Sequence, residues 1–172
     1  MSIYFIADTH FNHANIIKYC ARPFSCVESM NEILIKNWNN TIKSNDLVYH
    51  LGDVGLGDLT NILNRLHGKK KLIVGNHDKR LLNSNPRAYF SEVKDIDTIK
   101  IDKRQITLCH YSMQTWPQSH HGSWHLFGHS HGKLKGIGLS IDIGIDSTQL
   151  WRPISFEEVS NILKTKELDS SI

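Results

Sequence analysis

Seven side chains that are able to bind metal ions follow short apolar segments of the sequence. They are carboxylates, imidazoles and one amide, and each comes just after a predicted strand: Asp8, His10, Asp53, Asn76, His110, His129 and His131. Molecules that bind to open α/β sheets do so at the carboxyl ends of the strands, so these side chains are expected to converge at that edge of the sheet. Seven donors exceed the needs of one four-coordinate ion and suit two ions that share a bridging carboxylate. A set of oxygen and nitrogen donors without thiolate favours Mn²⁺, Fe or Zn²⁺ over a structural zinc site.

Each of these residues also has a plainer interpretation when it is taken alone. A single histidine at a strand end is more often a hydrogen-bonded polar residue than a metal ligand. The pair Gly75-Asn76 is ordinary turn chemistry. The prediction of a metal site therefore depends on five segments that carry such residues in the same position relative to a strand.

The elements that must position these groups alternate between strand and helix in the first half of the chain. Periodicity and breakers predict strands over 3–7, 46–51 and 72–74, and helices over 14–20, 29–41 and 58–66. Later segments are short β-strands at 88–93, 98–102, 105–109, 124–127 and 139–145, before a helix over 155–163. That helix starts with a capping box, Ser155 with Glu158. The alternation predicts an α/β sheet.

Composition indicates one globular domain over residues 1–172, with 40% hydrophobic and 22% charged residues. No apolar run is long enough to span a membrane, and the N-terminus lacks the features of a signal peptide. Three cysteines without CxxC spacing argue against a disulfide framework and fit a reducing cytoplasm. The net charge of +3 is too small to indicate nucleic-acid binding.

The polar motifs, taken in order, resemble the signature blocks of the calcineurin-like metallophosphoesterases: Asp8-x-His10, Gly52-Asp53, Gly75-Asn76-His77-Asp78, His110 and Gly128-His129-x-His131. Three further stretches resemble a small bacterial and phage subgroup: Phe11-Asn12-His13, Arg22-Pro23-Phe24 and residues 144–153. The resemblance implies an α/β fold, a four-layer α/β/β/α sandwich of two mixed sheets flanked by helices.

The resemblance also implies roles for single residues. One metal would be bound by Asp8, His10 and His131, the other by Asn76, His110 and His129, and Asp53 would bridge both. His77 matches a histidine that lies near the metals without binding them. The chain departs from the serine/threonine protein phosphatases, because no Val-Asp-Arg-Gly run follows Asp53 and Asp78 replaces their glutamate. A milder departure is Ala7, where a glycine is common. The implied cofactors are two divalent ions, Mn²⁺ first, with Fe, Zn²⁺ and Ni²⁺ as alternatives.

Two such ions roughly 3.5–4 Å apart hold a bridging water, lower its pKa toward about 7 and clamp the phosphoryl oxygens. The expected reaction is in-line attack of the metal-bridging hydroxide on phosphorus. The departing alkoxide needs a proton, and His77 is the candidate general acid because it follows a ligand directly. Asp78 is a neighbouring carboxylate that could pair with His77, although adjacent side chains often diverge.

Four residues are candidates for contact with the substrate: Asn12, His13, Arg22 and His121. Arg22 could supply a bidentate phosphate contact, and its alternative is a surface arginine at a helix end. For Asn12 and His13 the alternative is an ordinary polar surface. His121 lies with Trp116 in a loop over 111–123, and loops often carry specificity. Trp116 fits a pocket wall and the core equally well.

These residues predict a phosphodiesterase acting on a small or nucleotide-like substrate, because no cap domain or peptide groove is evident. A phosphomonoesterase with the same mechanism is the nearest alternative, and a nuclease would normally carry more positive charge. A non-catalytic scaffold of the same fold is the alternative from another class. The complete ligand set argues against it.

Overall fold

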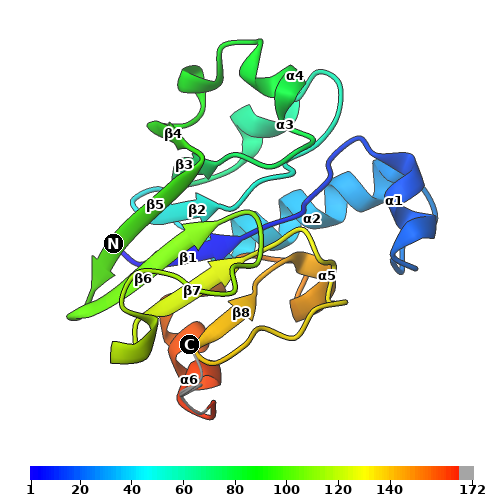
Figure 1. The fold of residues 1–172 in the computed structure, drawn as a ribbon. Helices are drawn as coiled ribbons and strands as arrows, with labels where there is room; N and C mark the ends of the chain where they lie inside the picture. The colour runs from blue at the N-terminus through cyan, green and yellow to red at the C-terminus, as the bar shows by residue number, and fades with distance from the viewer. Residues whose placement is uncertain (167–172) are drawn as a thin grey trace.

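Two β-sheets packed face to face form the centre of the computed structural model, which describes residues 1–166 (Figure 1). The first sheet has the strand order β4-β3-β2-β1-β9. Its strands are β1 Ile3–Ile6, β2 Leu47–His50, β3 Lys69–Ile73, β4 Glu92–Lys94 and β9 Ile154–Ser155. The first four are parallel, and β9 runs antiparallel to β1. The parallel strands therefore all end at one edge of this sheet.

The second sheet has the order β5-β6-β7-β8, formed by β5 Ile96–Ile101, β6 Arg104–Cys109, β7 Trp124–Phe127 and β8 Ser140–Asp142. β5 and β6 make an antiparallel hairpin, while β6, β7 and β8 are parallel. Asp102 and Lys103 form the hairpin turn with φ of 47° and 66°. Positive φ at both central residues matches the right-handed twist of the flanking strands.

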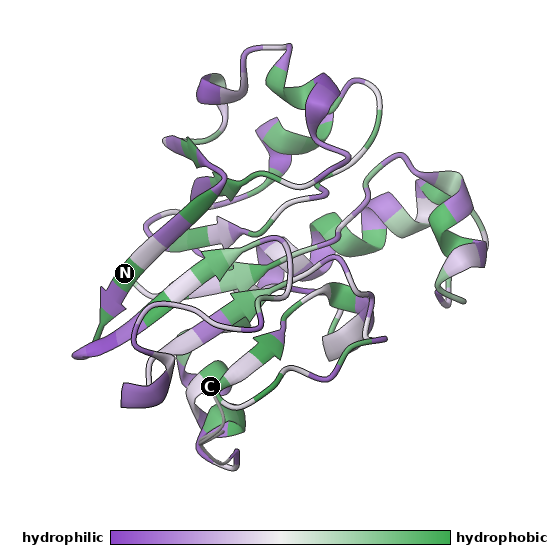
Figure 2. Ribbon diagram, viewed as in Figure 1, coloured by the Kyte–Doolittle hydropathy of each residue, from purple (hydrophilic) through white to green (hydrophobic). Residues whose placement is uncertain are grey.

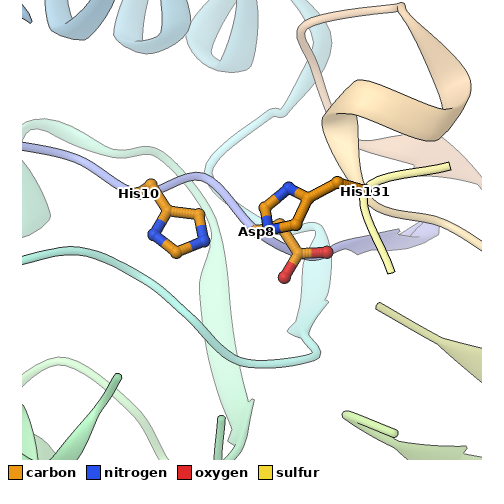
Figure 3. A group of neighbouring side chains, drawn as sticks. All are labelled: Asp8, His10 and His131. Carbon is orange, nitrogen blue, oxygen red and sulfur yellow. The ribbon is translucent and has the colours of Figure 1, made fainter. Parts of the chain in front are cut away.

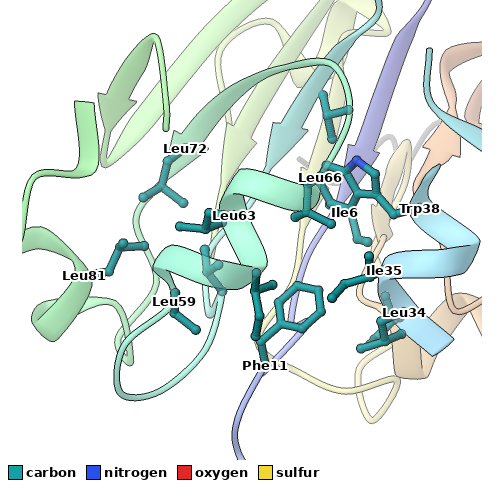
Figure 4. Close-up of a cluster of buried hydrophobic side chains, with 14 of the residues drawn as sticks. Ile6, Phe11, Leu34, Ile35, Trp38, Leu59, Leu63, Leu66, Leu72 and Leu81 are labelled. Carbon is teal, nitrogen blue, oxygen red and sulfur yellow. The ribbon is translucent and has the colours of Figure 1, made fainter. Parts of the chain in front are cut away.

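Helices α2 (Val27–Thr41) and α3 (Thr60–Arg65) cover the outer face of the first sheet. Met30, Leu34 and Trp38 recur every four residues along α2, so they lie on the helix face that meets the sheet. Together with side chains from α3 and the strands they form a buried cluster (Figure 4). Each large side chain buried here stabilises the fold by about 1.5–3 kcal/mol relative to exposure.

The space between the sheets holds a second core, to which β1 contributes by alternation. Phe5 and Ala7 belong to this core, whereas Ile6 belongs to the cluster under α2 and α3. Apolar residues accordingly concentrate along the strands of both sheets (Figure 2). Helix α6 (Phe156–Leu163) adds Val159 and Leu163 to the same core. The expected fold, two mixed sheets flanked by helices, is confirmed.

Short elements complete the chain: α1 (Ala14–Tyr19), α4 (Lys79–Leu82), α5 (Ile145–Thr148) and two 3₁₀ turns, η1 (Pro86–Ala88) and η2 (Ser119–His121). The strand expected at 72–74 begins earlier, at Lys69. Lys70 in this added part of the strand is buried, and its Nζ donates to the carbonyls of Leu66 and Gly68 at 2.8 and 3.1 Å.

Two further expectations for the β segments need correction. The segment expected at 139–145 divides into β8 and α5, and most of that expected at 88–93 precedes β4. The expected domain also includes residues 167–172, which lie outside the described part of the chain. Within residues 1–166, no helix combines the length and the apolar character needed to cross a bilayer.

Candidate metal centre

The predicted ligands converge where strands of both sheets end. Two groups made up entirely of predicted ligands each place one ligand atom per residue within 4.8 Å of the others: Asp8, His10 and His131, and Asp53, His110 and His129. Figure 3 shows the first group side by side, although its members come from opposite ends of the sequence. Asn76 adds its Oδ1, which lies 3.2 Å from His110 Nε2. All seven residues predicted as ligands are thus brought together.

Asp53, a member of the second group, also lies close to the first. Its Oδ2 is 3.5 Å from His10 Nε2 and 3.5 Å from His110 Nε2. Its Oδ1 accepts a hydrogen bond of 2.9 Å from the backbone N–H of His77. One carboxylate therefore faces both ligand groups and is itself held by the loop that carries Asn76.

Hydrogen bonds on the far side of two imidazole rings determine which nitrogen faces the site. His110 Nδ1 donates to the carbonyl of Leu51 at 2.7 Å, and His131 Nδ1 donates to Asp146 at 2.7 Å. Both rings therefore turn Nε2 toward the site, which is the nitrogen with which each would bind a metal ion. His10 Nε2 is buried and has no hydrogen-bond partner among residues 1–166.

The buried charges of the site call for a cation. Burial raises the pKa of Asp8 to about 7, because the cost of desolvation outweighs the opposing effect of the His131 and His110 charges. Burial would also raise the pKa of Asp53, but hydrogen bonding to His110 and the His110 charge lower it to about 2. Burial lowers the pKa of His10 to about 3, so its ring is neutral. Two carboxylates and the neutral His10 ring, whose Nε2 has no hydrogen-bond partner among residues 1–166, fit divalent metal ions.

The backbone of the site is held in an uncommon conformation. Five of the predicted ligands have positive φ: Asp8 at 58°, His10 at 48°, Asp53 at 56°, His129 at 67° and His131 at 49°. For residues other than glycine the left-handed region costs roughly 1–2 kcal/mol each. Hydrogen bonds impose it, including Asp8 N–H to Gly52 and His10 N–H to Asp53, both at 3.0 Å. Such strain is concentrated at functional sites.

Gly75 is required for close packing and not for a turn. A Cβ at this position would collide with the carboxylate and the backbone nitrogen of Asp53. Gly52, whose φ is 92°, would place a Cβ 2.5 Å from Gly75 N and 2.7 Å from His110 Nδ1. Side chains at either glycine would displace the Asp53 carboxylate or the His110 ring.

Asp78 supports the site and does not pair with His77. Its carboxylate is fully buried and accepts from three backbone N–H groups: Gly75 at 2.8 Å, Asp53 at 2.9 Å and Val54 at 2.9 Å. The loops after β2 and β3 are thereby tied together. The His77 ring instead is exposed and lies 5.4 Å from the His10 ring, centroid to centroid.

Two further carboxylates hold the loop of His129 and His131, and the sequence interpretation missed both. Asp142 accepts from the Ser130 hydroxyl, from Gly132 N–H at 3.1 Å and from Gly144 N–H at 2.8 Å. Asp146 accepts from His131 as described. The signal available in the sequence is two aspartates inside an otherwise apolar stretch at 141–146, where ionised side chains need partners.

Arg22 does not face the substrate side, contrary to the expected phosphate contact. Its guanidinium is buried and donates to both oxygens of Asp146 at 2.8 Å. It also donates to the carbonyls of Asp8 at 2.7 Å and Thr9 at 3.0 Å. These bonds engage the fork of the side chain, so Arg22 positions the first motif and Asp146.

Asn12 and His121 also lie differently from their expected role. The Asn12 side chain accepts from Asn31 Nδ2 at 2.7 Å and donates to the Asp58 carbonyl at 3.1 Å, which ties α2 to the loop before α3. His121 lies in η2, just before β7 begins, whereas the ligands follow the end of β7. The strand therefore separates His121 from the site. Trp116 is buried and stacks beside His125 at 5.5 Å, as part of the core.

His13 is the expected substrate residue that does line the site. Its Nδ1 lies 3.2 Å from His10 Nδ1, and its ring is 6.1 Å from that of His77. The half-buried His13 ring and the exposed His77 ring border an open cleft of about 450 Å³, together with His10 and His131. The cleft gives a small molecule access to the first group of predicted metal ligands, through His10 and His131.

The fold and the site define a metallophosphoesterase. The chain belongs to the calcineurin-like phosphoesterase superfamily, whose domain model matches residues 1–135. It is 36% identical over 178 residues to uncharacterized protein MJ1445 of Methanocaldococcus jannaschii, covering 94% of this chain and 91% of that protein. A protein of unknown function, AQ665 from Aquifex aeolicus, superposes with a TM-score of 0.75 at 26% identity, covering 94% of this chain and 98% of that one. The phosphoesterase YfcE from E. coli shares the fold, with a TM-score of 0.50 and 16% identity over 84% of this chain and 78% of that one.

Proposed function

We propose that this protein is a dinuclear metal-dependent phosphodiesterase that hydrolyses a small or nucleotide-like substrate. The observation that carries the proposal is the position of Asp53, whose Oδ2 is 3.5 Å from Nε2 of both His10 and His110. A single ion needs no such shared carboxylate, whereas two ions do. Asp8, His10 and His131 would hold one ion, and Asn76, His110 and His129 the other, with Asp53 common to both.

Metal ions bound here would acidify a water molecule and neutralise charge on the phosphoryl oxygens. Mn²⁺ is our first choice, and Fe, Zn²⁺ and Ni²⁺ suit the same donors. The neutral His10 ring and the Nε2 atoms of His110 and His131 are already oriented as ligands, so little reorganisation accompanies binding.

His77 is proposed to deliver the proton that the leaving oxygen needs. Its backbone is fixed by the 2.9 Å hydrogen bond to Asp53, while its ring is exposed at the cleft. A proton donor must be able to reach the leaving oxygen and must not be bound to a metal ion. The His77 ring meets both conditions in the proposed arrangement. Cys20, Cys26 and Cys109 are free thiols, which supports a reducing cytoplasm as the place of action.

The proposal is tested by metal titration together with a substrate comparison. Metal-free protein should bind two Mn²⁺ per chain by calorimetry and then hydrolyse bis(4-nitrophenyl) phosphate faster than 4-nitrophenyl phosphate. The Asp53→Ala variant should lose both metal binding and turnover. Binding of less than one ion per chain would refute the dinuclear site. A preference for the monoester would indicate a phosphatase, and full metal binding without turnover of either ester would favour the scaffold interpretation.

A further inference from the structure

The cleft beside the metal centre has a wall that the catalytic residues do not account for. Besides the imidazoles, it is lined by Ile16, Tyr19, Cys20 and Lys133. Ile16 is buried and Cys20 is half-buried, so together they form an apolar floor. This wall lies on the His10 and His131 side of the site, where it has no part in holding metal in the proposed function.

Tyr19 provides an exposed aromatic surface at the mouth of this cleft. It is the last residue of α1, and 69% of it is exposed to solvent. Its ring lies 6.3 Å from that of His13 in an edge arrangement, with an interplanar angle of 82°. A flat group that lies against the exposed part of the Tyr19 ring has an aromatic surface available for stacking.

Lys133 adds a positive charge to the same wall. It is exposed, and no carboxylate among the described residues forms an ion pair with its ammonium group. Asp146, a carboxylate of the same site, is already engaged by Arg22 and His131. The ammonium is therefore available to a negatively charged group of a ligand.

We propose that this cleft binds the leaving group, and that it selects one that joins an aromatic ring to a negative charge. The ring would stack on Tyr19 and the charge would pair with Lys133. The inference deepens the proposed phosphodiesterase function, on which it rests. In hydrolysis a bond forms from water oxygen to phosphorus, the bond to the leaving oxygen breaks with its electron pair, and that oxygen takes a proton. Because His77 borders the same cleft, the group bound there is the one that needs the proton.

The test uses two diesters with the same retained methyl group and different leaving groups. Methyl 4-nitrophenyl phosphate and methyl 3-carboxy-4-nitrophenyl phosphate differ by one carboxylate on the ring. Wild-type protein loaded with Mn²⁺ should prefer the carboxylated diester in kcat/KM. Lys133→Met should lower kcat/KM for the carboxylated diester by about tenfold, mainly through a higher KM, and so abolish the preference. Tenfold is the usual loss for one charged hydrogen bond. Tyr19→Ala should lower kcat/KM for both diesters by roughly fivefold, and Tyr19→Phe should retain it.

The matched control is Lys135→Met, an exposed lysine two residues away that does not line the cleft. It should leave the preference unchanged; an equal loss in Lys133→Met and Lys135→Met would overturn the specific role of Lys133. Binding of the two free phenols to the loaded protein separates this inference from the proposed function. Tighter binding of the carboxylated phenol, lost in Lys133→Met, supports the cleft even if no hydrolysis occurs. Equal binding of the two phenols, or none, overturns the inference even if both diesters are hydrolysed.

Discussion

Replacing Asp146 by asparagine tests whether the buried arginine network prepares the metal centre. Asp146 accepts from His131 Nδ1 at 2.7 Å and from Arg22 through two bonds of 2.8 Å. The side chains of Arg22 and Asp146 are 0% and 5% exposed, so the pair is shielded from water. An asparagine has the same shape but only one acceptor oxygen for the donors of Arg22 and His131. Its NH₂ group would face those donors that the oxygen does not accept from.

The expected loss has two parts that different measurements separate. Leaving the Arg22 guanidinium buried without its counter-charge should lower the free energy of unfolding by about 3–5 kcal/mol. Releasing the His131 ring from its orienting carboxylate should weaken metal binding at the site containing Asp8 by about 10–100-fold. Chemical denaturation of the metal-free protein measures the first quantity, and calorimetric titration with Mn²⁺ measures the second.

Glu158→Gln is the matched control, because it also replaces a carboxylate by its amide, in an ion pair that includes no predicted metal ligand. Glu158 pairs with Arg152 at 2.6 Å and accepts from Ser155 N–H, with its side chain 38% exposed. It should cost stability modestly and leave metal affinity unchanged. If Asp146→Asn loses stability but binds both metal ions as tightly as the wild type, the network only supports the fold and the reasoning about His131 is wrong.

Three further predictions follow from the same geometry. His77→Ala should keep both metal ions and lower kcat by about 10²–10⁴, while the exposed control His67→Ala keeps full rate; metal loss in His77→Ala would make it a ligand. Asp78→Asn should cost about 1–3 kcal/mol in denaturant unfolding and weaken metal binding, since one backbone N–H then lacks its acceptor; an unchanged midpoint would contradict this. The pKa of Asp8 is raised from 3.8 to about 7, so a metal ion that binds below pH 7 must displace its proton, and metal affinity should rise with pH up to about 7. The folded metal-free protein holds this proton more tightly than the unfolded chain, so its stability should fall as the pH rises between these two pKa values. Calorimetry in buffers of different ionisation enthalpy would reveal the protons, and pH-independent affinity would refute the role of Asp8.

The sequence predicted what is determined locally along the chain. Predicted ligands such as Asp53 and His110 lie within three residues of the ends of β2 and β6, so locating the strand end locates the side chain. The convergence of these ends follows from the parallel arrangement of the sheets, and the family resemblance supplied the pairing of ligands. The α/β class and the convergence of the predicted ligands could therefore be anticipated from the residues, and the two-sheet fold from the family resemblance.

Residues whose role depends on distant partners could not be anticipated in the same way. Arg22 reads as a surface or phosphate-binding arginine until Asp146, 124 positions away, is placed beside it. His121 is close to His129 in sequence, but β7 between them carries the two to opposite ends of the sheet. Asp78 is adjacent to His77, yet three backbone donors from two loops determine its direction.

The positive φ angles at the ligands have a consequence for how this protein would respond to selection. Glycine adopts that conformation at no steric cost, so replacing a ligand such as His129 by glycine would relieve the backbone while destroying the site. Selection for thermostability would thus favour glycine at these positions, whereas selection for metal binding would favour the present side chains. A library screened for heat resistance in the absence of metal would drift toward folded but inert variants. A stabilisation campaign on this scaffold therefore needs the metal present at every round.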